Sequence, residues 1–190
     1  MRTWRRAGSP GACSSWPALA SRFAEPSLIG ESFAGSGPNA AHLNVVLGRK
    51  GGPVEAAWAT ALATPRAGHV PFVVVVRPNV PVKPLTLFVN KADLRGERHS
   101  TLTWGAAQAG VARGVATAVA DGLIPTNEVD ELVLIAAVWV DWAANDEETV
   151  YENNFVATRD ALRAAAEREP ALDDVLAAGD NPANPFFRRS

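Results

Sequence analysis

The stretch from Val70 to Lys91 constrains the fold of this chain more than any other segment. Two short apolar runs, rich in β-branched and aromatic residues, form its two ends: Val70–Val76 and Leu85–Val89. Such runs are typical of strands. The connection between them, residues 77–84, contains three prolines, and proline has no backbone N–H to give to a strand ladder. We therefore predict two neighbouring strands joined by a stiff, extended loop that lies outside the sheet.

The composition fits one globular domain with tails. Of the 190 residues, 47% are hydrophobic and 20% are charged, a balance that allows a substantial core. The net charge of −2 creates no field that would attract nucleic acid or an anionic membrane. The longest apolar run, Leu132–Val140, has about half the length of a membrane-spanning helix. We expect no nucleic-acid partner and no membrane partner. The single cysteine excludes an internal disulfide and is compatible with a cytoplasmic location.

The first residues differ in composition from the rest of the chain. Residues 1–24 carry four arginines and no acidic residue, and they are rich in Ser, Ala, Gly and Pro. This composition is typical of a transit peptide, of a disordered tail or of translation from an upstream start codon. We expect residues 1–25 to be a disordered or processed extension, residues 26–178 to form the domain, and residues 179–190 to be a C-terminal tail.

Strand and helix patterns alternate along the expected domain. Besides the two strands described above, the pattern predicts strands at Ser27–Glu31, Ala41–Gly48 and Leu132–Val140, the last buried on both faces in mid-sheet. It predicts helices from Pro53, over Leu102–Ala120, from Thr126 to Glu131, over Glu147–Glu169 and up to Ala178, and a loop at Arg95–Ser100. Glycines on the second helix, Gly105, Gly110 and Gly114, favour close approach to a neighbouring surface. The result is an α/β (α+β) single domain, a mixed sheet covered by helices.

Two polar side chains share one face of the strand Ala41–Gly48. Alternation places His42 and Asn44 side by side. An imidazole in such a place can act as an acid near neutral pH, and a structural histidine fits the same spacing. His69 and His99 are far from His42 in the sequence, and no His-x-x-x-His pair indicates a metal site. We therefore predict no metal site.

Further polar residues are candidates with two interpretations each. Alternation places Lys91 and Asp93 on one face near a strand end, as part of a cleft or as a surface ion pair. Gln108 lies in a helix of small apolar residues, where an inward amide must find partners. Asp141 and Trp142 follow the buried strand and either line a cleft or serve as a helix cap and a core indole.

Several motifs follow one another in the order and spacing of a known family. They are Ala41-His42-Leu43-Asn44, Gly52-Pro53-x-x-x-Ala57, Arg77-Pro78-Asn79-Val80-Pro81-Val82-Lys83-Pro84-x-Thr86-Leu87, Asn90-Lys91, Ala107-Gln108, Gly122-Leu123-Ile124-Pro125 and Asn154-Phe155-x-Ala157-Thr158-Arg159. With these motifs, the chain resembles the formaldehyde-activating enzymes, which condense formaldehyde with tetrahydromethanopterin. The resemblance covers residues 28–170.

The resemblance implies a compact subunit with the fold type of a ribosomal-protein domain, assembled as a homopentamer with the pterin between neighbouring subunits. It implies condensation of formaldehyde with a reduced pterin to the 5,10-methylene adduct, with loss of water. No metal or tightly bound cofactor takes part, and the pterin is a co-substrate. Hydroxide is a poor leaving group, so an acid speeds its departure. The family histidine proposed as this acid corresponds to His42.

The resemblance also implies a set of pterin contacts, which correspond to Asn44, Val73, Lys91, Asp93 and Gln108. The family has Asp at the place of Asn44, Leu at that of Val73, Thr at that of Asp93 and His at that of Asp141. Asn44 carries no charge to stabilise a protonated His42, whereas Asp93 restores a carboxylate on another segment. Two functions therefore stay open. One is the condensation itself, with tetrahydromethanopterin or another carrier such as tetrahydrofolate. The other is a divergent paralogue that binds a pterin or an aldehyde adduct, as a carrier or sensor, without efficient turnover.

Overall fold

The computed structural model describes residues 25–184 and 187, so nearly all of the expected extension at residues 1–25 lies outside the described residues. The strands are β1 (Leu28–Ala34), β2 (Ala41–Arg49), β3 (Phe72–Val73), β4 (Val75–Arg77), β5 (Val80–Pro81), β6 (Leu85–Asn90) and β7 (Leu132–Trp139). The α-helices are α1 (Pro53–Ala63), α2 (Gly96–Thr101), α3 (Gln108–Ala120), α4 (Glu147–Glu167) and α5 (Leu172–Ala178). A 3₁₀ turn (Gly37–Asn39) precedes β2, and a π-helical segment (Leu102–Ala107) joins α2 to α3. Within the described residues, no helix has the length and apolar character needed to cross a membrane.

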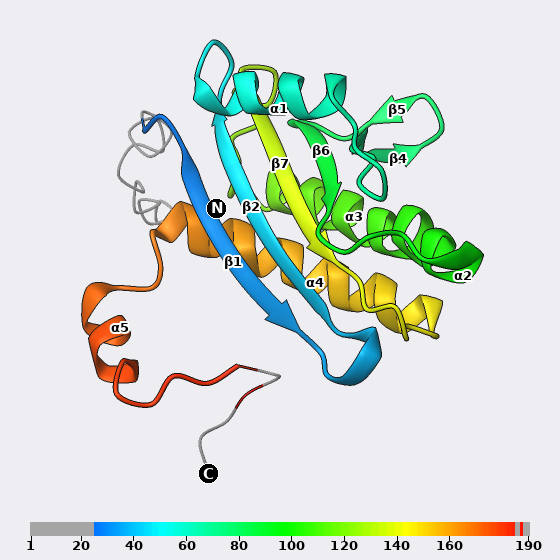
Figure 1. Cartoon of the computed structure of the whole chain (residues 1–190). Helices are drawn as coiled ribbons and strands as arrows, with labels where there is room; N and C mark the ends of the chain where they lie inside the picture. Colours follow the sequence, from blue (N-terminus) through cyan, green and yellow to red (C-terminus); the bar gives the residue numbers. More distant parts are fainter. Residues whose placement is uncertain (1–24, 185–186, 188–190) are drawn as a thin grey trace, which may run out of the picture.

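A five-stranded mixed sheet forms the centre of the fold (Figure 1). Its strand order is β1-β2-β7-β6-β3, in which β6 and β7 run parallel and the other neighbours antiparallel. A parallel pair needs a crossover connection, which the helical run from Gly96 to Ala120 supplies. The mixed sheet with its helices confirms the predicted α/β (α+β) class, and β7 lies in mid-sheet as predicted.

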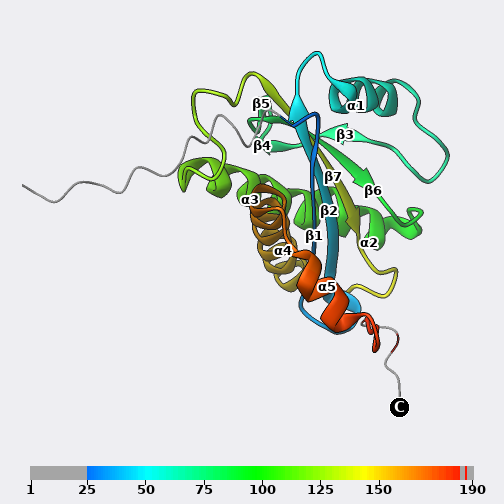
Figure 2. The same ribbon diagram turned by 90° about the vertical axis from the view of Figure 1, so that its left-hand side faces the viewer.

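The two faces of the sheet are covered unequally. Helices α3 and α4 pack along one face, which we call the helix-covered face (Figure 2). On the opposite face, α1 covers only one end, where Val54 packs against Gly48. We call this second face the open face. There β7 exposes part of Ile135, Ala137 and Trp139, so the prediction that β7 is buried on both faces is wrong for the open face.

The core lies between the sheet and the helices α3 and α4. It contains alternate residues of the two central strands together with small and branched residues of the helices: Leu43, Val45, Leu47, Leu134, Ala136, Val138, Val111, Val115, Ala157 and Ala161. Full burial of one leucine or valine side chain contributes roughly 1.5–3 kcal/mol. This face therefore supplies most of the driving force that holds β2 in place, and with it the polar residues of β2 that point the other way.

The segment Val70–Lys91 forms two neighbouring strands, as predicted, but its first run is interrupted. β3 pairs with β6, and the chain then leaves the main sheet, where β4 and β5 pair with each other as a separate hairpin. Asn79 makes the turn of this hairpin with a φ of 64°, a conformation that asparagine tolerates better than most residues. The proline-rich connection lies outside the sheet, as predicted, but it is a small hairpin rather than an extended loop.

Two other segments differ from the prediction. The expected loop at Arg95–Ser100 is helical, because α2 begins at Gly96 and continues through the π-helical segment into α3. Its residues are polar and mostly exposed, apart from the buried His99, so the segment shows no apolar period. The expected helix from Thr126 to Glu131 is a series of turns, in which backbone N–H groups bond to carbonyl oxygens three residues earlier.

Small residues let α3 and α4 approach each other closely. A Cβ atom on Gly110 would lie 2.9 Å from Asn154 Cβ and closer still to the carbonyl oxygen of Tyr151. A Cβ atom on Gly114 would lie 2.6 Å from Thr158 Cβ. By contrast, nothing lies within 4 Å of such an atom on Gly105. The predicted close approach is therefore confirmed at Gly110 and Gly114 but not at Gly105.

Candidate active site

Three of the predicted site residues meet on the open face. His42 and Asn44 alternate with buried residues along β2, so both side chains point to this face. Lys91 directly follows β6, and its N–H donates to the carbonyl oxygen of Val138 at 2.8 Å. This bond continues the β6–β7 pairing by one residue. Alternation then turns the Lys91 side chain towards His42 and Asn44.

A chain of polar contacts joins these three residues to a fourth. Lys91 Nζ donates to Asn44 Oδ1 at 2.6 Å and lies 3.3 Å from His42 Nδ1. On the other side of the ring, His42 Nε2 lies 2.8 Å from Glu31 Oε1. Glu31 is on β1, opposite Asn44 in the β1–β2 register. Glu31 is not among the predicted site residues. Alternation along β1 could have predicted the face on which its side chain lies. It could not have predicted the contact with His42, because the register of two strands is not a local property of the sequence.

The electrostatics of this group favour proton transfer. Partial burial lowers the pKa of Lys91 from its ordinary value, and the nearby carboxylate of Glu31 opposes this shift. Lys91 therefore releases a proton more readily than a lysine in water. Because its amine faces an imidazole nitrogen at 3.3 Å, the group can hold and pass on a proton, as general acid–base chemistry requires.

The partners of His42 also determine which ring nitrogen carries hydrogen in the neutral imidazole. The ammonium group of Lys91 only donates, so Nδ1 of the ring must accept. Nε2 then carries the hydrogen and donates to Glu31. The His42 side chain is 36% exposed, which favours the predicted acid over a buried structural histidine.

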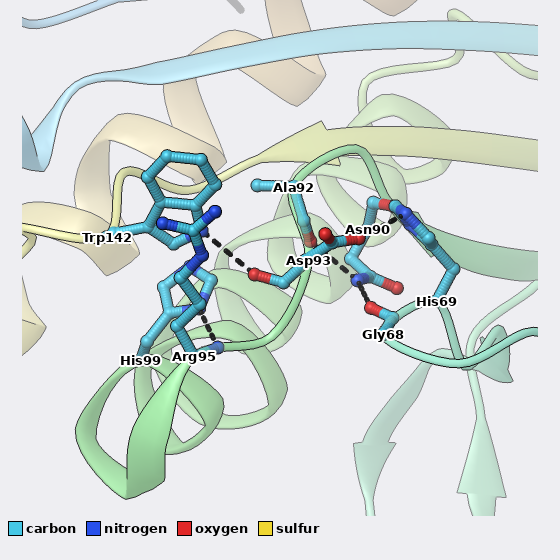
Figure 3. A network of polar contacts seen from close by, with 8 residues as sticks. All are labelled: Gly68, His69, Asn90, Ala92, Asp93, Arg95, His99 and Trp142. Atoms are coloured by element: carbon cyan, nitrogen blue, oxygen red, sulfur yellow. Dashed lines mark hydrogen bonds and ion pairs between the residues drawn. The ribbon is translucent and has the colours of Figure 1, made fainter.

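Asp93 belongs to a different network, drawn in Figure 3. Its Oδ1 lies 2.7 Å from His69 Nε2, and His69 Nδ1 lies 2.8 Å from the carbonyl oxygen of Asn90. Because β6 ends at Asn90, strand alternation does not extend to Asp93. Alternation therefore does not determine where Asp93 points, and the partner of the Asp93 carboxylate is His69 rather than Lys91.

The residues after β7 fasten the loop that carries Asp93. Trp142 Nε1 donates to the carbonyl oxygen of Asp93 at 2.9 Å, and the guanidinium carbon of Arg95 lies 3.4 Å from the centre of the Trp142 ring (Figure 3). Asp141 Oδ1 accepts from the N–H of Ala143 at 2.8 Å. Asp141 thus stabilises a turn rather than a helix, and the half-exposed Trp142 is not a core indole.

Gln108 lies on the other side of the sheet, on α3. Its Oε1 accepts from the N–H of Val75 at 2.6 Å, which satisfies the buried amide oxygen. A cavity of about 360 Å³ beside it is lined by Val70, Phe72, Val75, Trp104 and Gln108. Two aromatic rings and an amide in one cavity suit a flat heterocyclic ligand. The aromatic residues of this cavity are not among the predicted site residues.

One chain therefore holds the predicted site residues in separate places. His42, Asn44 and Lys91 cluster on the open face, and Val73 points to the same face because it pairs with Leu87 of β6. Asp93 lies in the loop after β6, whereas Gln108 lies on the helix-covered side. Across residues 25–184 and 187, no three His, Cys, Asp or Glu side chains are grouped so that they would hold a metal ion.

Comparisons with known proteins agree with the motifs. The family model described as formaldehyde-activating enzyme (Fae) matches residues 29–187. The chain is 42% identical over 160 residues to the 5,6,7,8-tetrahydromethanopterin hydro-lyase of Methanosarcina barkeri, an alignment that covers 84% of this chain and 90% of that protein. It is 40% identical over 159 residues to the bifunctional enzyme Fae/Hps of Methanosphaera stadtmanae, covering 84% of this chain and 39% of that protein. With the bifunctional enzyme Fae/Hps of Methanococcoides burtonii, it shares 41% identity over 157 residues, covering 83% of this chain and 40% of that protein.

The family match extends over nearly all the described residues, and the first of these relatives is matched over almost its whole length. The resemblance suggested by the motifs is thereby confirmed, and the chain belongs to the formaldehyde-activating enzyme family.

Proposed function

We propose that this protein condenses formaldehyde with tetrahydromethanopterin, or with a closely related reduced pterin, to give the methylene adduct and water. The observation that carries this proposal is the imidazole of His42, which is partly exposed and contacts Lys91 at one nitrogen and Glu31 at the other. Family membership and the hydro-lyase name of the Methanosarcina barkeri relative support it. The alternative, a paralogue that binds without efficient turnover, is not favoured.

The proposed reaction has three steps. First, one amine of the pterin attacks the carbon of formaldehyde, and the proton that this amine loses is taken up by the oxygen to give a carbinolamine. Next, the protonated imidazole of His42 gives its proton to the hydroxyl oxygen, the C–O bond breaks with its electron pair on oxygen, and water leaves. The second amine then attacks the resulting iminium carbon, and its proton returns to the imidazole. The protein therefore ends in the protonation state in which it began.

The remaining predicted contacts are proposed to hold the pterin. Asn44 and Lys91 offer polar groups beside His42, and Val73 offers an apolar contact on the same face. The oxygen of Gln108 is engaged by Val75, so its NH₂ group is the part that can donate to a ligand. Asp93 is proposed to contact the pterin from the loop after β6. The pterin acts as a co-substrate, and no tightly bound cofactor is part of the proposal.

We further propose that the working protein is a homo-oligomer, as the homopentamer of the family implies, with the pterin bound between copies. Two features of the single chain support this. Gln108 and its cavity lie on the opposite side of the sheet from His42. In addition, the open face leaves apolar side chains such as Ile29, Ile135 and Trp139 partly or largely exposed, as is typical of a surface that a partner covers. A second copy would cover this face and bring its own residues towards His42.

A rate measurement tests the proposed function. Purified protein is mixed with formaldehyde and either tetrahydromethanopterin or tetrahydrofolate, and formation of the methylene adduct is followed against the spontaneous reaction. We expect acceleration with at least one carrier and its near loss in His42→Ala. Binding without acceleration by any carrier would establish the alternative function instead. Light scattering of the same sample measures the number of copies.

A further inference from the structure

Glu31 approaches His42 from the edge strand of the sheet. In the β1–β2 register, Phe33 lies opposite His42, and Glu31 lies opposite Asn44. Glu31 is thus the diagonal neighbour of His42 on the open face, within reach of a long side chain. Its Oε1 lies 2.8 Å from His42 Nε2, and the Glu31 side chain is 57% exposed.

The other neighbours of the imidazole do not supply a negative charge. Lys91, which faces Nδ1, carries a positive charge or none, and Asn44 on the same strand is neutral. The centre of the Phe33 ring lies 5.9 Å from that of the His42 ring. Trp139 of β7 lies opposite His42 in the β2–β7 register. Both side chains are uncharged. Among the described residues, Glu31 is the carboxylate in contact with the ring. A positive charge on the imidazole therefore depends on Glu31 for its balance.

We propose that Glu31 is a positioning residue of the condensation, a role that rests on the function proposed above. Its carboxylate holds the Nε2 side of His42 and stabilises the imidazolium from which the hydroxyl oxygen of the carbinolamine takes its proton. As the C–O bond breaks, the proton passes from the ring to the departing oxygen. The proton of the second amine later restores the imidazolium. Glu31 stays ionised throughout and is not consumed.

A purely structural ion pair does not explain this placement. Pairs between exposed side chains contribute little to stability because water screens them, and Glu31 is more than half exposed. Removal of its charge should therefore leave the fold intact. Lys91 adds a second reason, because partial burial lowers its pKa and Glu31 counteracts that shift. Glu31 thus acts on both groups that meet at Nδ1 of the imidazole, the His42 ring and the Lys91 amine.

The test compares two variants of Glu31 with a matched control. Glu31→Gln keeps the size and a hydrogen-bond acceptor but removes the charge, whereas Glu31→Asp keeps the charge on a shorter side chain. The control is Glu152→Gln on α4, because Glu152 is also a partly exposed carboxylate, 45% exposed, in an ion pair with Arg113. We expect kcat to fall by about tenfold or more in Glu31→Gln, with KM for the pterin nearly unchanged. Glu31→Asp should recover part of the loss, and Glu152→Gln should match the wild type.

An NMR measurement without substrate gives an independent readout. The ring nitrogen signals of His42 are recorded at one fixed pH, in the wild type and in each variant. We expect the Nε2 signal to move in Glu31→Gln, because its 2.8 Å partner loses its charge, and to stay in place in Glu152→Gln. A wild-type kcat together with an unmoved Nε2 signal in Glu31→Gln would overturn the positioning role. Failure of the wild type to accelerate the reaction with any pterin would instead overturn the proposed function, whatever the NMR signal shows.

Discussion

Replacement of Gly110 by alanine should destabilise the protein, whereas the same replacement at Gly105 should stabilise it. Both glycines lie in the continuous helical run that ends with α3. A Cβ atom on Gly110 would meet the backbone of α4 at Tyr151 and Phe155 and the Cβ of Asn154. Around Gly105, no atom lies within 4 Å of the added carbon.

The expected size of the two effects follows from opposing terms. Alanine is favoured over glycine in a helix by about 1 kcal/mol, and this gain applies at both positions. At Gly110 the new carbon would lie 2.9 Å from Asn154 Cβ, well inside the 3.4 Å at which ordinary contact begins. Helix α4 cannot simply retreat, because it also packs on β1 and β2. Overpacking of this kind typically costs about 1–3 kcal/mol and occasionally more. Because the contact at Gly110 involves backbone atoms, we expect the upper part of this range there.

The free energies of unfolding are measured by urea denaturation with circular dichroism, at one protein concentration, since an oligomer gains stability with concentration. Gly110→Ala should lose about 1–2 kcal/mol relative to the wild type, since the helix gain of about 1 kcal/mol offsets part of the overpacking cost. Gly105→Ala should gain up to about 1 kcal/mol. If Gly110→Ala proved as stable as Gly105→Ala, the close approach of α3 and α4 would not be a constraint and the reasoning would be refuted.

Three further predictions concern charged groups. Burial lowers the pKa of Lys91 in the folded protein below its ordinary 10.5. At pH values between this lowered pKa and 10.5, the unfolded state binds more protons than the folded state, so the free energy of unfolding should rise with pH. Lys91→Met should lack this rise when urea unfolding is repeated across that pH window. Asp93→Asn should raise KM for the pterin because it removes the proposed pterin contact. His69→Gln breaks the same ion pair and should leave KM unchanged. Equal KM values in the two variants would show that Asp93 serves only as the partner of His69. The N-cap hydrogen bond from the N–H of Thr149 lowers the pKa of Asp146. The contribution of this hydrogen bond to the stability of the fold should therefore be present at neutral pH and be lost as the pH falls through that lowered pKa. Asp146→Ala should accordingly lower the melting temperature at pH 7, and a difference that did not shrink in acid would contradict this account.

Part of the candidate site was predictable because it depends on one strand. Alternation along β2 places His42 and Asn44 on the same face, whatever the rest of the chain does. The family motifs add Lys91 to the site, whereas alternation alone left it as part of a cleft or as a surface ion pair. The structure then joins the three through the bonds of Lys91 to Asn44 and towards His42.

Other parts of the site were not predictable from local patterns. Asp93 was expected beside Lys91 because alternation was carried past the true end of β6 at Asn90. Glu31 went unnoticed because its contact with His42 depends on how β1 and β2 are aligned. A slip of one residue in that register would turn Glu31 to the helix-covered face.

Local sequence was thus enough to establish the class of fold, the central strand, the faces of individual strands and, through the motifs, the family. Long-range pairing established where each strand ends, that one face of the sheet is open, and that Glu31, His42 and Lys91 meet there. The physical reason is that side-chain alternation and helical period are properties of neighbouring residues. Register and burial instead depend on which segments, distant in the sequence, pair and pack with one another.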